Sequence, residues 1–427
     1  MSWQPDCAAW RRQRNAARSV REGHYQAFRS AGNLASIGWA WFTALLLLYN
    51  LFSTPAGMYP QKGHLRFFLE IIMKEGRSLK NLAVELERQL TSKKDMIVPV
   101  MKMHVSTSAH GQCALLVDEQ GSEQAYPVTD YALRQIADKH AIPYAYFERM
   151  RQEQPVLFDQ NVNTWLHANA SVNRLVRTLD GKARAFLTDR YRRIDNWDLA
   201  NYILPILSRL PGARFESVEL TDSRMFLKVV TSKVSCEVAP GDVIQAGVIV
   251  SNSEIGHGKL RVEPLIYRLV CRNGMIVADR AMRKTHLGRK LISDDDNVVV
   301  FQDDTLKAED HALFLKTRDM VESAVSEVTF RLISAKMQKT MGIKLLGDPV
   351  KSVEVLANRF AFNDDESGGV LRHLIEEGDL SGFGLLNAVT GYSQDIADYE
   401  RATDFEEFGG HMLNFEPVDW KAIVMPA

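Results

Sequence analysis

The sequence predicts an α+β fold, in which a central antiparallel meander sheet packs against a long helix and the N-terminal and C-terminal parts are helical. Short apolar segments follow one another closely from Phe215 to Ala278, as strands joined by hairpins do. A long segment with helical periodicity, residues 308–341, comes next. The length of 427 residues, with 46% hydrophobic and 25% charged residues, is typical of a globular protein with two or three domains.

We expect four parts along the chain. Residues 1–72 form a leader, 73–180 a part with helices and a hairpin, 181–342 a β-rich core with its long closing helix, and 343–427 an acidic helical part. From Lys351 onward there are five basic and fifteen acidic residues. The whole chain has a formal charge of -1, which argues against a protein that coats nucleic acid by bulk charge. Any polyanion site must therefore be local.

The first 72 residues differ in composition from the rest, with eight Lys/Arg against three acids. They contain an apolar run of sixteen residues, 37–52, whereas a bilayer-spanning helix needs about 20. Three interpretations compete: a signal or anchor, a buried helix, or upstream sequence attached by a start codon assigned too early, with Met73 or a nearby residue as the true start. More than thirty residues precede the run, which is long for a signal leader. We expect no stable membrane insertion.

The number and spacing of the cysteines indicate the cellular compartment. Four are present, with neither a CxxC pair nor a dense framework, at Cys7, Cys113, Cys236 and Cys271. This scatter predicts neither a zinc site nor a disulfide-stapled secreted fold. A reducing, cytoplasmic location fits best.

The part from residue 73 to 180 is expected to begin with an amphipathic helix, because leucines recur at helical spacing from Leu79 after a capping Ser78. A hairpin with its turn at Asp118–Gly121 follows. Two helices separated before Pro143 come next, at a spacing that resembles a helix-turn-helix. Such pairs more often pack within their own domain.

The central part is expected to open with a strand at Ala185–Leu187 and a helix from near Asp195 that Pro205 should kink. The predicted meander strands are Phe215–Leu220, Met225–Thr231, Ile244–Ser251, Lys259–Cys271 and Met275–Ala278. Asn273-Gly274 is a strong signal for the last hairpin turn, because both residues tolerate positive φ.

The long helix is expected to pack on the sheet through Val321, Val325, Val328 and Leu332, and to end at Gly342. A coiled coil with a partner is the alternative, although the repeat is short for one. A further helix-like segment runs from Leu385 to Tyr399.

Three segments together resemble one family. They are RAFLTDRYRRIDNWDL (184–199), IVSNSEIGHGKLRVEPLIYRLVCRNGMIV (249–277) and GFGLLNAVTGYSQDIADYERATDFEEFGGHML (382–413). They are similar to phage- and plasmid-like bacterial proteins defined by domain of unknown function 932. The similarity runs from about Leu79 to Leu413 and does not extend before Met73. The resemblance implies a mobile genetic element and supplies no catalytic residues.

A basic stretch is the main functional signal. Between Lys259 and Lys290 there are nine Lys/Arg and only Glu263 and Asp279 as acids. Such side chains can neutralise phosphates, and Tyr191, Trp197 and Tyr267 could add stacking surfaces. The predicted nucleic-acid-binding residues are Arg190, Tyr191, Arg192, Arg193, Lys259, Arg261, Arg268, Arg272, Arg283, Lys284, Arg289 and Lys290, with Asn252, Ser253, His257 and Asn273 as loop candidates. The alternative is a solvated basic face balanced by the acidic C-terminal part.

An enzyme is the second hypothesis. Asp294, Asp295 and Asp296 are weak candidate metal ligands, and with nearby lysines they could form a magnesium-dependent nuclease. The run is also typical of a solvated loop. The chain contains no G-x-x-x-x-G-K-[ST], G-x-S-x-G or H-E-x-x-H, so phosphate-loop ATPases, α/β-hydrolases and zincins lose support. No cofactor is predicted.

These observations favour a non-catalytic, nucleic-acid-associated accessory protein of a phage or plasmid. Single-stranded DNA binding or annealing is its sharpest form, because the expected order of helix, meander and closing helix loosely resembles single-strand annealing proteins of recombination. A homo-oligomer would fit annealing. The alternatives are the metal-dependent nuclease and an interaction protein that neutralises a host defence.

Overall fold

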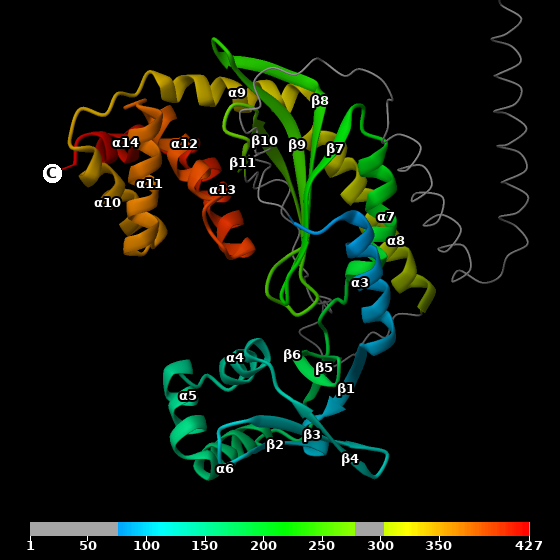
Figure 1. Cartoon of the computed structure of the whole chain (residues 1–427). Coiled ribbons are helices and arrows are strands. Elements are labelled where there is room, and N and C mark those ends of the chain that lie inside the picture. The colour runs from blue at the N-terminus through cyan, green and yellow to red at the C-terminus, as the bar shows by residue number, and fades with distance from the viewer. Residues whose placement is uncertain (1–75, 278–302, 427) are drawn as a thin grey trace, which may run out of the picture. The chain divides into compact units, whose positions relative to one another are not determined.

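The computed structural model describes residues 76–277 and 303–426 (Figure 1). All described residues belong to one compact unit, Phe67–Ala427. The predicted leader and its apolar run therefore lie outside the described residues. Within the described ranges, no helix is both long and apolar enough to cross a membrane.

The first described helix is α3 (Leu79–Ser92), as predicted. Ser78 caps it, because its hydroxyl oxygen accepts a hydrogen bond from the Asn81 backbone N–H at 3.1 Å. Leu82 and Leu86 are buried on one face, where they join the core beneath the five-stranded sheet.

Two three-stranded antiparallel sheets follow. One has the order β1-β5-β6 and consists of β1 (Lys94–Pro99), β5 (Asn173–Leu179) and β6 (Lys182–Thr188). The other has the order β2-β3-β4 and consists of β2 (Met103–Thr107), β3 (Cys113–Glu119) and β4 (Ser122–Pro127), with a single 3-10 turn (Val100–Lys102) before it. The predicted hairpin turn joins β3 to β4, where Gln120 and Gly121 both have positive φ.

Three helices pack against these sheets: α4 (Asp130–Lys139), α5 (Tyr144–Glu153) and α6 (Pro155–Leu166). The break before Pro143 is confirmed, whereas α6 was not predicted. Leu133 and Phe147 are buried in the same core as Phe158 of α6, so α4 and α5 pack within this part of the chain.

The predicted meander is confirmed as a five-stranded antiparallel sheet with the order β11-β10-β9-β8-β7 (Figure 1). Its strands are β7 (Ala213–Leu220), β8 (Met225–Ala239), β9 (Asp242–Asn252), β10 (Arg261–Arg268) and β11 (Asn273–Ile276). The position of the last turn was predicted wrongly. Asn273 pairs with Arg268 inside the ladder, and Arg272, with φ of 49°, is the turn residue at positive φ. Asn273 is buried and donates to Thr390 Oγ1 at 2.6 Å, a tertiary contact that overrides its turn preference.

The helices α7 (Asn196–Ser208) and α8 (Asp303–Ala324) cover one face of this sheet, and α9 (Glu327–Met341) continues from α8 (Figure 1). The single long helix that was predicted is thus two helices. Ser326 caps α9 by accepting from the Thr329 N–H at 3.3 Å. Because the break changes the helical phase, Val321 is buried, whereas Val328 and Leu332 are 70% and 65% exposed. The predicted packing was wrong for these last two.

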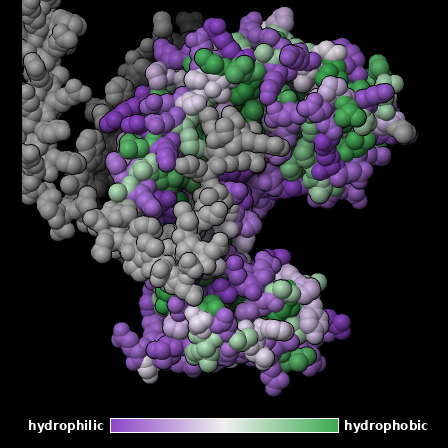
Figure 2. Space-filling model, turned by 180° about the vertical axis from the view of Figure 1, so that it is seen from behind, coloured by the Kyte–Doolittle hydropathy of each residue, from purple (hydrophilic) through white to green (hydrophobic). Residues whose placement is uncertain are grey.

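The C-terminal part consists of five helices: α10 (Pro349–Phe360), α11 (Asp364–Glu377), α12 (Gly382–Tyr392), α13 (Tyr399–Met412) and α14 (Pro417–Val424). Residues 382–391 of α12 are all buried, so this helix lies at the centre of the five C-terminal helices. The helix predicted from Leu385 to Tyr399 corresponds to α12 from Leu385 to Tyr392, and it ends there, because residues 393–398 form a loop before α13 begins at Tyr399. On the face drawn in Figure 2, hydrophobic residues lie in patches among hydrophilic ones. The α+β class and its central meander are confirmed.

Candidate nucleic-acid interface at two loops

Two loops from the segments that carried the resemblance lie against each other. The first loop, residues 189–195, joins β6 to α7, and the second loop, residues 253–260, joins β9 to β10. The Tyr191 hydroxyl donates to the Ser253 carbonyl at 3.3 Å. Gln135 of α4 donates to the Ile255 carbonyl at 2.6 Å. The structure therefore brings together the candidates Arg190–Arg193 with Asn252, Ser253 and His257.

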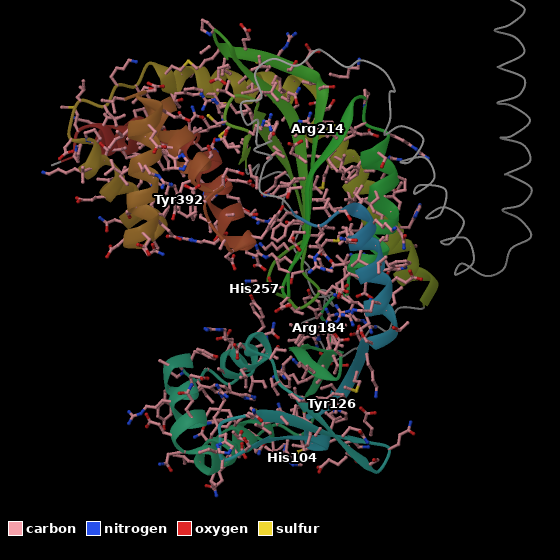
Figure 3. The ribbon with its side chains drawn as sticks, viewed as in Figure 1. His104, Tyr126, Arg184, Arg214, His257 and Tyr392 are labelled. Atoms are coloured by element: carbon pink, nitrogen blue, oxygen red, sulfur yellow. The ribbon has the colours of Figure 1, made fainter. Side chains whose placement is uncertain are left out.

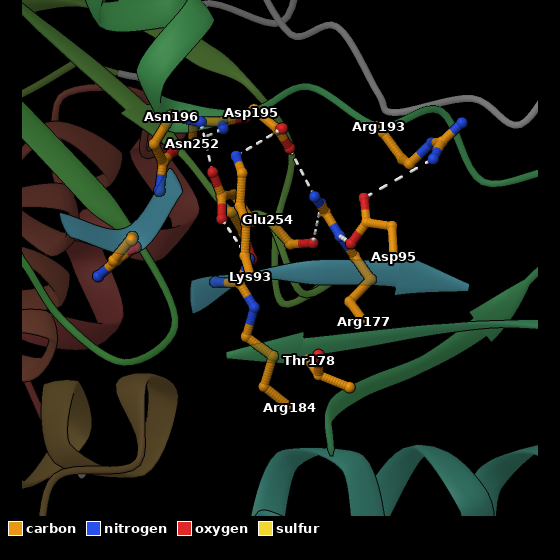
Figure 4. A network of polar contacts seen from close by, with 12 residues as sticks. Lys93, Asp95, Arg177, Thr178, Arg184, Arg193, Asp195, Asn196, Asn252 and Glu254 are labelled. Carbon is orange, nitrogen blue, oxygen red and sulfur yellow. Dashed lines mark hydrogen bonds and ion pairs between the residues drawn. The ribbon is translucent and has the colours of Figure 1, made fainter. Parts of the chain in front are cut away.

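Arg177 of β5 fixes both loops from beneath (Figure 4). Its side chain is 0% exposed and donates from Nε to Asp95 Oδ1 at 2.8 Å. Its two terminal nitrogens donate to Asp195 Oδ1 at 2.5 Å and to the Glu254 carbonyl at 2.7 Å. One guanidinium thus links β1, the first loop and the second loop. A buried arginine is stable only when its donors are matched in this way.

Glu254 is the buried acid of the second loop. One of its oxygens accepts from Arg184 at 2.5 Å and the other accepts from the Asn196 backbone N–H at 2.6 Å. Asn196 is the first residue of α7, so this carboxylate lies at a helix N-terminus, where negative charge is stabilised. Asn252 donates to the Ile194 carbonyl at 3.0 Å, and Lys93 pairs with Asp195 at 2.6 Å. We call the set Lys93, Asp95, Arg177, Arg184, Asp195, Asn196, Asn252 and Glu254 the buried network.

Burial and neighbouring charges set the protonation states of the titratable groups at the two loops. Burial raises the pKa of Asp195, but Arg177 and Lys93 outweigh it and bring the pKa down to about 2. Burial raises the pKa of Tyr191 to about 12, so its hydroxyl remains a donor at neutral pH. Burial, aided by Arg224, lowers the pKa of His257 below its ordinary value, so its ring is mainly neutral at pH 7.

Three cations of the loops face outward. Arg193 is 51% exposed and lies 3.7 Å from Asp95, a loose ion pair. Arg190 and Lys259 are exposed, and neither forms an ion pair with another residue of the described ranges. Arg192, which also belongs to the first loop, is half-buried. The carboxylates of the buried network thus pair with Lys93, Arg177 and Arg184, whereas Arg190, Arg193 and Lys259 are exposed to solvent and could contact an anion.

Other predicted residues are placed elsewhere. Arg261 pairs with Glu407 of α13, and Arg268 pairs with Asp242 at 2.9 Å and with Glu377 at 3.1 Å. Asn273 is buried against α12, and Arg272 is half-buried at the β10–β11 turn. Arg261, Arg268 and Asn273 stabilise the contact between the sheet and the C-terminal helices, and Arg261 and Arg268 do not offer free charge. Arg283, Lys284, Arg289, Lys290 and Asp294–Asp296 lie outside the described residues.

The predicted stacking surfaces also differ from the observed ones. Tyr267 is 2% exposed, Tyr191 is engaged with the second loop, and Trp197 is half-buried at the start of α7. The exposed ring of the second loop is instead His257, whose centroid lies 4.8 Å from that of Tyr131 in α4. In Figure 3, His257 lies on the loop at the lower end of the five-stranded sheet.

Sequence reasoning missed several residues of the site. Glu254 and Asp195 stand inside the segments that carried the resemblance, next to residues that were selected, and their acidic character within basic surroundings was a usable signal. Lys93, Asp95, Arg177 and Tyr131 gave no such signal, because only the fold brings them to the loops. Among residues 76–277 and 303–426, no group of three or more His, Cys, Asp or Glu is placed to hold a metal ion.

The model of the family described as "Domain of unknown function (DUF932)" matches residues 186–407. This range contains both loops, although it is shorter than the expected similarity from Leu79 to Leu413, and it leaves out Lys93, Asp95, Arg177 and Arg184. A search of curated proteins and a search of solved structures each found no match.

Proposed function

The chain belongs to the family of the domain of unknown function DUF932, and because that description names no activity, we propose from the chain's own geometry that it binds single-stranded nucleic acid through the two loops. One observation carries this proposal: Arg190, Arg193 and Lys259 stand exposed on loops that a buried network holds in place. The phage or plasmid setting extends the proposal on the basis of the family resemblance in the sequence, and a role in strand annealing extends it on the basis of the order of helix, meander and closing helix.

A rigid support is what makes three cations a binding site. Exposed lysine and arginine side chains are common on protein surfaces and are usually only solvated. Here the loop backbones are fixed through Arg177, Glu254 and Tyr191, so a ligand orders few backbone dihedrals when it binds. Phosphate contacts from such cations give affinity without base preference and with strong salt dependence.

The net charge of the chain favours contact with only a short stretch of nucleic acid. The whole chain carries a charge of -1 and its C-terminal part is acidic, so a long duplex would meet repulsion beyond the loops. A single strand is flexible enough to place two or three phosphates on the cations and to turn its bases toward a ring. We therefore expect weak binding that prefers single strands.

Fluorescence anisotropy with labelled single- and double-stranded oligonucleotides over a salt series tests this with the full chain. The variant Arg190→Ala/Arg193→Ala/Lys259→Ala should bind single strands more weakly. Its slope of log affinity against log salt should fall by up to about 2, at about 0.7 per lost phosphate contact. The matched control replaces three exposed cations outside the two loops, Arg209, Lys339 and Lys421, with alanine and should retain the slope. Absence of wild-type binding at low salt contradicts the proposal.

The predicted residues outside the described ranges provide a second set of variants. Replacing Arg283, Lys284, Arg289 and Lys290 together should reduce the slope further if the whole basic stretch touches the strand. Annealing of complementary strands, with an oligomer detected by light scattering, would support the recombination form of the proposal. Cutting of the probe in Mg²⁺ would support the nuclease instead.

A further inference from the structure

Two aromatic rings meet where the second loop lies against α4. The ring centroids of Tyr131, from α4, and His257, from the second loop, lie 4.8 Å apart with an angle of 59° between their planes. His257 is exposed and Tyr131 is half-buried. We propose that this ring pair is a stacking site for one base of a single strand, a proposal that rests on the proposed function and names the ligand group.

The backbone of His257 is held on both sides. Its N–H donates to Ser253 Oγ at 3.0 Å, and its carbonyl accepts from Arg224 Nε at 2.9 Å. Ser253 itself is buried and is tied to Tyr191 of the first loop. The ring therefore projects from a fixed point, and stacking on it does not require a loop to become ordered. Base–aromatic stacking on such a support contributes affinity with little sequence preference.

Glycines on both sides keep side chains away from this ring. Gly256 has φ of +78°, and a Cβ there would lie 2.8 Å from Leu187 Cδ2 and 3.7 Å from Tyr191 Cε2. Gly258 has φ of +155°, and a Cβ would lie 3.1 Å from Arg224 Nε. Both positions thus favour glycine for conformational and steric reasons. The consequence is an exposed ring in a loop whose neighbouring residues bring no side chain to cover it.

The chemistry of the ring suits a base better than a phosphate. Burial and Arg224 lower the pKa of His257, so the ring is mainly neutral at pH 7 and offers a π surface more than a charge. Cations for the flanking phosphates come from Lys259, two residues further on, and from Arg190 of the first loop. The ring pair therefore completes the phosphate contacts with a contact to the base.

The test uses the full chain and an oligonucleotide that carries the fluorescent base 2-aminopurine, whose emission is quenched by stacking. The wild-type protein should quench it on binding. His257→Ala and Tyr131→Ala should each weaken binding by roughly 5- to 150-fold, the range for losing one base–aromatic stack. The salt slope should be unchanged, because no phosphate contact is lost. His257→Phe keeps a ring and should retain both binding and quenching.

The control is Tyr146→Ala on α5, which removes a ring that is 51% exposed and outside the two loops, and it should bind like the wild type. Wild-type binding without any quenching overturns the stacking site, whether or not the variants fold. The same holds if His257→Ala and Tyr131→Ala both bind as tightly as the control. Neither outcome contradicts the proposed function, in which the loop cations bind phosphates. Absence of wild-type binding overturns both proposals.

Discussion

Lys228 of β8 and Glu406 of α13 form an ion pair, with 2.6 Å between Nζ and Oε2, in which each side chain is only 1% exposed. Thr403 Oγ1 lies 3.2 Å from the same ammonium, and the centre of the Tyr399 ring lies 4.7 Å from it. Burial alone lowers the pKa of Lys228, but Glu406 and Tyr399 raise it above its ordinary value. The lysine is therefore charged inside the protein, and its partner belongs to the helix that covers this face of the sheet.

Removing one member of this pair should be strongly destabilising. Glu406→Leu leaves an ammonium buried without a counter-ion, which should lower the free energy of unfolding by about 3–5 kcal/mol. Urea unfolding followed by circular dichroism measures this change. The control Glu153→Gln breaks the exposed pair of Arg149 and Glu153 and should leave the urea midpoint nearly unchanged, because water screens such pairs.

The double variant Lys228→Met/Glu406→Leu separates the pair from its surroundings. With no charge left unmatched, it should recover most of the stability lost in Glu406→Leu. If Glu406→Leu unfolds at the same urea concentration as the Glu153→Gln control, water or another group must neutralise or solvate the charge of Lys228.

The low pKa of Asp195 predicts acid sensitivity of the two loops. Its folded-state pKa of about 2 lies below the ordinary value of 3.8, so its stabilising contribution is complete above pH 4 and is lost as the pH falls toward 2. This difference in pKa corresponds to about 2 kcal/mol in the free energy of unfolding at neutral pH. Asp195→Asn should therefore be less stable than wild type by about this amount at pH 7, and the gap should shrink below pH 4.

Urea unfolding at pH 7, 5, 4 and 3 measures this gap. The control Asp138→Asn changes an exposed acid of α4, and its stability should follow the wild-type curve at each pH. A gap between wild type and Asp195→Asn that stays constant from pH 7 to pH 3 contradicts the role given to this carboxylate.

The sequence was most informative where local pattern and tertiary packing agree. The strands β8, β9 and β10 could be predicted because long apolar runs such as Ile244–Ser251 leave few alternatives to a buried strand. At Asn273-Gly274 the local turn preference was strong, but the buried contact with Thr390 decided the outcome. At Ser326 a capping serine followed by Glu327 stood in a continuous helical pattern, and the periodicity concealed the break.

The residues of the candidate site also fall into two kinds, those that the sequence indicates and those that only the structure reveals. The two loops could be found because their residues stand together in recognisable segments. Arg177 could not, because it is 77 residues away from Glu254 and 82 residues away from Asp95 in the sequence. Nothing in the sequence near Arg177 says that β5 lies beneath both loops. Pairings of this kind follow from the topology of the sheets and need the structure.

The break between α8 and α9 provides a third prediction. Ser326 satisfies one of the free N–H groups at the start of α9, so Ser326→Ala should lower the free energy of unfolding by about 1 kcal/mol. The control Ser323→Ala lies on the exposed side of the last turn of α8, where alanine is a good helix former, and should be neutral or slightly stabilising. Equal thermal unfolding of the two variants would mean that packing alone positions the break.

The last prediction concerns the edge strand β2, whose open side is covered by side chains of α6. Asn163 accepts from the Val105 N–H at 2.7 Å and donates to the Val105 carbonyl at 2.8 Å, as a neighbouring strand would. Asp159 accepts from the Thr107 N–H at 2.8 Å, one helical turn earlier. An uncovered edge of this kind is a template for pairing with another chain.

Replacing Asn163 should therefore affect both stability and association. Asn163→Ala leaves the Val105 N–H and carbonyl without these partners, which should cost about 1–3 kcal/mol in urea unfolding. It should also increase light scattering on mild heating, because the strand edge becomes available to other molecules. Thr164→Ala changes the next residue, which is exposed, and serves as the control. If both variants unfold and scatter alike, water replaces the asparagine at little cost, and the edge is protected by the packing of α6 rather than by its polar side chains.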